Sequence, residues 1–89
     1  MSAVVTLIAK ADCPLCDQAK ALLERLSGEY DLRVEVVGLG TAQGHELAAR
    51  SGMAFPPGVL LDGEPFSYGR LSERKLRRHL DRTASRAAP

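Results

Sequence analysis

The hydrophobic period of the chain changes at a pair of cysteines near its N-terminus. Residues 4–9 form an apolar run rich in β-branched side chains, which is typical of a buried strand. From Pro14 onward the apolar residues recur on one face of a helix that Gly28 can close. Residues 33–37 have the pattern of a second strand. A strand, a helix and a strand in this order predict a parallel pair with a right-handed crossover.

The next segment predicts a short helix and a hairpin. After the loop at residues 38–44, Thr41 can cap a helix that runs through about Ser51 and is closed by Gly52. The stretch "FPPG" at residues 55–58 is expected to be irregular because proline cannot donate a backbone hydrogen bond. Residues 59–61 and 66–68 flank Asp-Gly, a pair that fits the tight turn of a β-hairpin.

A last helix is expected after Gly69, with Ser72 as its N-cap. Leu76 and Leu80 give this helix an apolar stripe, and the tail from about residue 83 is expected to be frayed. The whole chain of 89 residues is long enough for one small domain and no second one. No apolar run approaches a membrane span, and residues 1–10 do not resemble a signal peptide, so we expect a cytoplasmic protein without a membrane partner.

Cys13 and Cys16 are the only cysteines, and three interpretations of the pair are open: a metal clamp, a structural staple and a redox pair. A structural zinc site needs four ligands, and the further candidates, His45 and His79, lie on two different predicted helices. A staple that closes so short a loop gains only about 2 kcal/mol, against about 4.7 kcal/mol for a 100-residue loop. A Cys-x-x-Cys between a strand and a helix favours the redox interpretation.

The predicted helix gives the two cysteines unequal roles. Cys13 would be the exposed N-cap and Cys16 would lie in the first turn. The helix dipole is worth up to ~2 kcal/mol to a thiolate at the cap, and one pKa unit is about 1.36 kcal/mol. The pKa of Cys13 would thus fall from about 8.5 toward neutrality, with further help from Lys10. Cys13 is therefore predicted to attack and Cys16 to resolve the mixed disulfide.

Nearly the whole chain resembles the glutaredoxin family, including the small NrdH-type redoxins that serve ribonucleotide reductase. The resemblance rests on "KADCPLC" after the first strand, on "FPPGVLLDGE", and on "FSYGRLSERKL" before the last helix. It implies a thioredoxin-like α/β fold, with a mixed four-stranded sheet of order 2-1-3-4 and helices on both faces. It also implies a cis-proline beside the disulfide, for which the spacing favours Pro57, preceded by Pro56, over Pro56 itself.

The same resemblance implies dithiol–disulfide exchange on protein clients, with the Cys13–Cys16 disulfide as the redox centre and no bound cofactor. The chain departs from the family at positions that hold glutathione. Leu15 replaces an aromatic residue, Gly69 lacks a second glycine, Arg70 stands where an acidic residue is expected, and Pro56 has no N–H. We therefore expect glutathione to be a poor electron donor and a flavoprotein thioredoxin reductase to be a better one.

Basic residues concentrate at the C-terminal end, where residues 65–89 hold seven basic and two acidic side chains although the whole chain carries a net charge of only +1. This segment is interpreted either as a solvated helix face or as a docking surface for an acidic partner. Nucleic-acid binding is not expected, because aromatics are few and the basic residues ring the predicted helix. We expect a monomer. The alternatives to a dithiol–disulfide oxidoreductase are a non-enzymatic binding module, metal-holding or adaptor, and a glutathione-dependent glutaredoxin.

Overall fold

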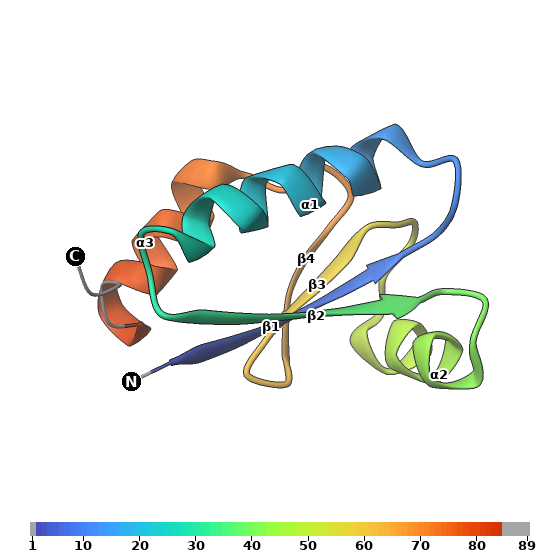
Figure 1. The fold of residues 1–89 in the computed structure, drawn as a ribbon. Helices are drawn as coiled ribbons and strands as arrows, with labels where there is room; N and C mark the ends of the chain where they lie inside the picture. The colour runs from blue at the N-terminus through green and yellow to red at the C-terminus, as the bar shows by residue number, and fades with distance from the viewer. Residues whose placement is uncertain (1, 85–89) are drawn as a thin grey trace.

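The computed structural model describes residues 2–84, which form one mixed four-stranded sheet and three helices (Figure 1). The elements follow the chain as β1 (Ala3–Ala9), α1 (Pro14–Ser27), β2 (Leu32–Gly38), α2 (Ala42–Ser51), β3 (Gly58–Leu61), β4 (Glu64–Tyr68) and α3 (Glu73–Thr83). The strands are arranged in the order β2-β1-β3-β4, which confirms the predicted fold class.

β1 is the centre of the sheet. It pairs in parallel with β2 and antiparallel with β3, and β4 closes the sheet as the partner of β3. The predicted Asp-Gly hairpin turn is present, with φ values of 50° at Asp62 and 84° at Gly63. Asp62 is also bonded to the start of β1, because its side chain and its N–H join the N–H and C=O of Val4 at 2.8 Å each. The hairpin is thereby tied to the central strand at its turn.

The helices cover both faces of the sheet. Figure 1 shows α1 and α3 on one side and α2 on the other. Alternate residues of β1 face α1 and α3 in one buried core, which includes Leu7 of β1, Leu23 of α1 and Leu76 of α3. Because the apolar residues of α1 and the leucine pair of α3 face this core, both patterns could be recognised in the sequence.

An ion-pair cluster joins the C-terminal half of α1 and its following turn to α3. Arg77 donates two hydrogen bonds to Glu29, at 2.9 and 2.8 Å, and a third to Glu73 at 2.8 Å. Glu73 also accepts a hydrogen bond from Arg25 at 3.1 Å. The hydrogen bonds from Arg77 and Arg25 lower the pKa of Glu73 below its ordinary value. Beside this cluster the hydroxyl of Tyr30 donates to Asp81 at 2.6 Å.

The predicted boundaries differ from the structure at the ends of several elements. β4 begins at Glu64, two residues before the predicted strand of residues 66–68. The predicted N-cap Thr41 is confirmed, since its hydroxyl accepts the N–H of Gly44, so residues 42–44 belong to α2 although they were also assigned to the preceding loop. α3 continues through Thr83 with Ala84 as its C-cap, one residue beyond the expected start of fraying. The remainder of the expected tail, residues 85–89, lies outside the described residues. No helix within residues 2–84 has the length and apolar character needed to cross a membrane.

The cluster predicts an acid-dependent loss of stability. A carboxylate whose pKa is lower in the folded chain stabilises the fold above its unfolded pKa, and this contribution is lost as the pH falls through the folded pKa. Glu73→Gln should therefore lower the urea midpoint at pH 7, and the difference from the unsubstituted protein should shrink as the pH falls below about 4. Glu46→Gln, at an exposed carboxylate of α2, is the matched control and should change neither midpoint. An equal deficit for Glu73→Gln at both pH values would contradict the assignment.

Candidate active site

Cys13 and Cys16 are joined by a disulfide at the N-terminus of α1, with their Cα atoms 5.2 Å apart. Cys13 is the N-cap, as predicted, with extended backbone angles, and Pro14 occupies the first helical position. The Sγ of Cys13 accepts a hydrogen bond from the N–H of Cys16 at 3.2 Å. One N–H of the first turn, which has no partner within the helix, is thus directed at the sulfur.

The chain enters this cap through a tight turn. Asp12 has a φ of 54°, in the left-handed region that Asp tolerates better than most residues. The turn carries the backbone from the end of β1 into α1 within four residues. Cys13 is 7% exposed and Cys16 is 0% exposed. The expectation that Cys13 is exposed was therefore wrong, because Cys13 packs with the core. It is nevertheless the more accessible of the two cysteines.

The proline loop lies beside the cysteine loop. The peptide bond between Pro56 and Pro57 is cis, which confirms the choice of Pro57 made from the spacing. Gly58 pairs with Ile8 in the antiparallel register of β1 and β3. Pro57 therefore lies level with the last residue of β1, at the same edge of the sheet from which the cysteine loop departs. Pro57 is buried, whereas Pro56, which precedes it, is partly exposed.

Gly69 ties the proline loop to the turn before α3. Its N–H donates to the C=O of Pro57 at 2.8 Å, and its φ of 76° lies in the left-handed region. A Cβ at this position would lie 2.6 Å from Cε2 of the Phe55 ring. Two segments that are distant in the sequence, the proline loop and the turn after β4, thus form one rim around the disulfide end of the fold.

An aromatic pair on this rim could not be predicted from the sequence. Phe55 and Tyr68 meet edge to face with their ring centroids 5.3 Å apart. They remain 53% and 47% exposed, although both are large apolar side chains. Only the pairing of Gly58 with Tyr68 across the β3–β4 hairpin brings them together, and nothing in the local sequence of either residue signals this contact.

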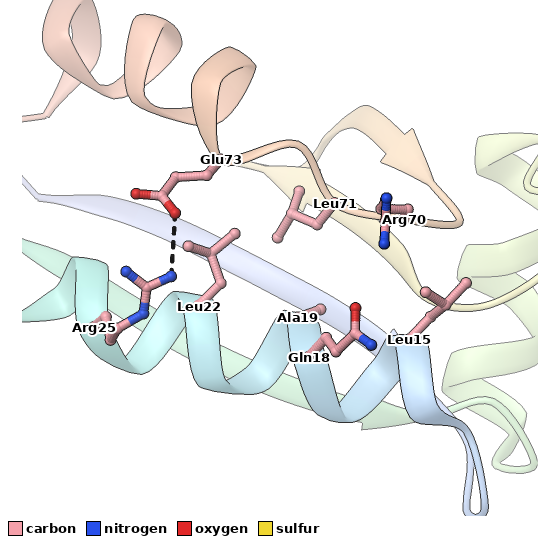
Figure 2. Close-up of a pocket in the computed structure, with 8 residues that line it drawn as sticks. All are labelled: Leu15, Gln18, Ala19, Leu22, Arg25, Arg70, Leu71 and Glu73. Atoms are coloured by element: carbon pink, nitrogen blue, oxygen red, sulfur yellow. Dashed lines mark hydrogen bonds and ion pairs between the residues drawn. The ribbon is translucent and has the colours of Figure 1, made fainter.

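A groove of about 320 Å³ runs along α1. Figure 2 shows it between α1 and the turn that leads into α3. Leu15 lines one end of the groove, opposite Arg70 and Leu71. Together with Pro14, Leu15 separates the two cysteines in the sequence. The Arg25–Glu73 ion pair closes the other end. The position that carries an aromatic residue in glutaredoxins is thus an aliphatic wall here.

The remaining predicted residues lie at different distances from the disulfide. Arg70 is exposed on the groove and follows Gly69 directly. Lys10 lines a separate hollow of about 540 Å³ with Asp12 and residues of the β2–α2 loop, and neither cysteine lines that hollow. Pro57, Gly69 and Arg70 therefore lie on one rim, whereas Lys10 lines the hollow beside the β2–α2 loop, and its predicted role toward Cys13 stays a prediction.

The candidate zinc ligands are separated by the sheet. His45 belongs to α2 and His79 to α3, where its ring contacts Phe66 with centroids 5.7 Å apart. Within residues 2–84 no group of three or more His, Cys, Asp or Glu side chains is arranged to hold a metal ion. The cysteine pair therefore has no complement of further ligands in the described part of the chain.

The close packing of Gly69 gives a specific prediction. Gly69→Ala forces a Cβ into a left-handed residue and against the Phe55 ring, so it should destabilise the protein by about 1–3 kcal/mol. Gly52→Ala is the matched control, because Gly52 has a φ of 71° but no atom within 4 Å of an added Cβ. Urea denaturation should show a larger loss for Gly69→Ala, and adding Phe55→Ala should recover the excess. Equal losses for the two glycine variants would show that the Phe55 ring moves aside freely.

Comparisons with known proteins agree with this geometry. Residues 4–81 match the family described as glutaredoxin-like domain (DUF836). No curated protein matches the chain. Among solved structures, a mutant thioredoxin from Halobacterium salinarum NRC-1 is similar at a TM-score of 0.71 and 21% identity, over 98% of this chain and 78% of that one.

Glutaredoxin 1 from Francisella tularensis, solved with cacodylate, is similar at a TM-score of 0.59 and 13% identity, over 90% of this chain and 94% of that one. At these identities the two structures support the thioredoxin-like fold, while the family match covers most of the chain. Together with the Cys13–Cys16 disulfide they support a redox function in general. The chain belongs to the glutaredoxin-like domain family.

Proposed function

We propose that this protein is a dithiol–disulfide oxidoreductase that reduces disulfides in protein clients. The observation that carries the proposal is the position of the Cys13–Cys16 disulfide at the first turn of α1, on the same sheet edge as the cis-proline Pro57. A four-residue disulfide loop adds little stability to a fold that already buries a continuous core. The pair is therefore better explained by chemistry than by structural support.

In the reduced protein, the N-cap position favours a thiolate on Cys13. The N–H of Cys16 already points at this sulfur, and the positive end of the α1 dipole adds to its effect. Cys16 is buried in the same turn and has less access to a partner. Cys13 is therefore the attacking sulfur and Cys16 the resolving one.

The exchange proceeds in two balanced steps. The Cys13 thiolate attacks one sulfur of the client disulfide, so that a Cys13–client bond forms while the client disulfide breaks and its second sulfur leaves as a thiolate. The Cys16 thiol loses its proton and attacks the Sγ of Cys13, which closes the Cys13–Cys16 disulfide and releases the first client sulfur. Two electrons pass to the client, whose two thiolates take up two protons from solvent and from Cys16.

The rim around the disulfide suits a protein client. The exposed Phe55 and Tyr68 rings provide apolar contact area next to Pro56 and Pro57. Burying such rings against a partner contributes favourable free energy without a requirement for one particular side chain. A small thiol has too little surface to use this area, whereas an exposed client segment can cover it.

Two features of the rim argue against efficient use of glutathione. Pro56, the residue before the cis-proline, offers no N–H. The first acidic residue after Gly69 is Glu73, and its carboxylate is bound by Arg25 and Arg77. A lost hydrogen bond that leaves a buried partner unsatisfied costs about 1–3 kcal/mol, so two such losses lower the affinity by about 30-fold or more.

Unequal cysteine roles predict an asymmetric trapping result. Cys16→Ser should accumulate a mixed disulfide between Cys13 and a disulfide-containing protein such as insulin, because the second step is blocked. Cys13→Ser is the matched control and should accumulate none, because the buried Cys16 sulfur does not reach a client. Non-reducing electrophoresis and intact mass measure both adducts. Trapping through Cys16 alone, or no turnover of insulin by the unsubstituted protein, would refute the proposal.

The electron donor is predicted to be a flavoprotein thioredoxin reductase. Two coupled assays that follow NADPH oxidation compare recycling of the oxidised protein by this reductase and by glutathione with glutathione reductase. We expect turnover with glutathione to be slower by about tenfold or more, for the reasons given by Pro56 and Glu73. Efficient turnover with glutathione alone would assign the protein to the glutathione-dependent glutaredoxins.

A further inference from the structure

The side chains of α3 divide into three faces. Leu76 and Leu80 are buried against the sheet. Glu73 and Arg77 face α1 and form the ion-pair cluster. The remaining basic residues are exposed and lie together on the side opposite the leucines: Arg74, Lys75, Arg78 and Arg82. At 3.6 residues per turn they occupy roughly 100° of arc. We call these four residues the basic face. The expectation that basic residues ring the helix was wrong, because even with Arg77 the basic residues of α3 span only about 160°.

The basic face is uncompensated. Within residues 2–84 none of its four side chains makes an ion pair or hydrogen bond, in contrast to Arg25 and Arg77. Arg74 and Arg78, and Arg78 and Arg82, are like charges four residues apart, which destabilise a helix. Arg74 and Lys75 also lie in the first turn of α3, where the helix dipole disfavours cations. Helix stability therefore does not account for the arrangement.

Arg70 links the redox rim to the basic face. Gly69 is hydrogen-bonded to Pro57, Arg70 follows it on the groove, and Arg74 lies in the first turn of α3. Because Glu73 is paired with Arg25, α3 begins about 18 Å along α1 from Cys13. Figure 1 shows α3 leading away from this turn toward the end of the sheet where β1 begins. Positive charge thus runs from Arg70, next to the rim, along the 11 residues of α3, about 16 Å, a length that an extended segment of about five residues covers.

We propose that the basic face, with Arg70, docks an acidic segment of the protein that exchanges its disulfide with Cys13. The inference rests on the proposed oxidoreductase function and names the charge of its partner. A protein is favoured over nucleic acid because residues 70–83 contain no Phe, Tyr or Trp to stack on bases. The charges would steer the partner and raise its association rate, since opposite surface potentials accelerate encounter by about 10-fold or more.

The test compares two synthetic peptides that contain the same internal disulfide, then a spacer of about six glycine and serine residues that spans about 20 Å, and then either five glutamates or five glutamines. The reduced protein is mixed with each peptide in a single-turnover measurement at low salt and at 0.5 M NaCl. We expect the glutamate peptide to be reduced about tenfold faster at low salt, and the two rates to converge at high salt. Equal rates at low salt would overturn the inference while leaving the oxidoreductase function standing.

Matched variants locate the effect. Arg74→Gln combined with Arg78→Gln should reduce the rate ratio of the two peptides to about threefold or less. Arg33→Gln combined with Arg50→Gln removes the same net charge from exposed sites on β2 and α2, and should keep the ratio near tenfold. A ratio that falls equally in both double variants would overturn the inference, because it would show an effect of net charge alone.

A binding experiment separates failure of this inference from failure of the proposed function. If neither peptide is reduced, the proposed oxidoreductase function fails. Docking is still tested in that case by fluorescence anisotropy of labelled peptides with the Cys13→Ser, Cys16→Ser protein. Tighter binding of the glutamate peptide that Arg74→Gln and Arg78→Gln abolish would support the inference. Tighter binding of a 20-nucleotide oligothymidine, or of phosphatidylserine vesicles, at 150 mM salt would overturn it in favour of another polyanion.

Discussion

The pairing of β1 with strands on both of its sides organises the molecule. β2 and β3 are hydrogen-bonded to its two edges, and its residues are almost all buried. Three loops therefore meet at the C-terminal end of β1. The cysteine loop leaves from it, the proline loop enters beside it, and the loop after β2 begins level with it. Pro57 is 44 positions away from Cys13 in the sequence and is brought to the same end of the sheet through this register.

Much of the fold could be predicted because the signals are local. The period of α1, the caps Cys13, Thr41 and Ser72, and the Asp62-Gly63 turn each lie within a few residues of the element that they define. The cis bond was expected from the resemblance to glutaredoxins, and the spacing from the hairpin turn correctly selected Pro57 over Pro56.

The features that could not be predicted depend on side chains brought together by the sheet and by helix packing. The Phe55–Tyr68 contact needs the β3–β4 register, and the contact of an added Cβ at Gly69 needs the Phe55 rotamer. The division of α3 into paired and unpaired cations needs the position of Glu29 at the end of α1. The sequence does not distinguish Arg77 from Arg78. In the structure Arg77 belongs to the ion-pair cluster and Arg78 is exposed. Sequence reasoning therefore located the redox pair better than it described the surface around it.

The cluster of Arg25, Glu29, Glu73 and Arg77 has a consequence for recognition of the two redox states. α1 carries both sulfurs at its first turn, and its other end is held to α3 by charged hydrogen bonds that the redox reaction does not touch. The helix therefore has a fixed anchor about 20 Å from the reacting atoms, given a rise of about 1.5 Å per residue. Opening the disulfide is expected to alter the first turn and to leave the frame in place. The thioredoxin reductase that we propose as electron donor would then have to sense the difference close to Cys13, because the rest of the frame is expected to be the same in both redox states.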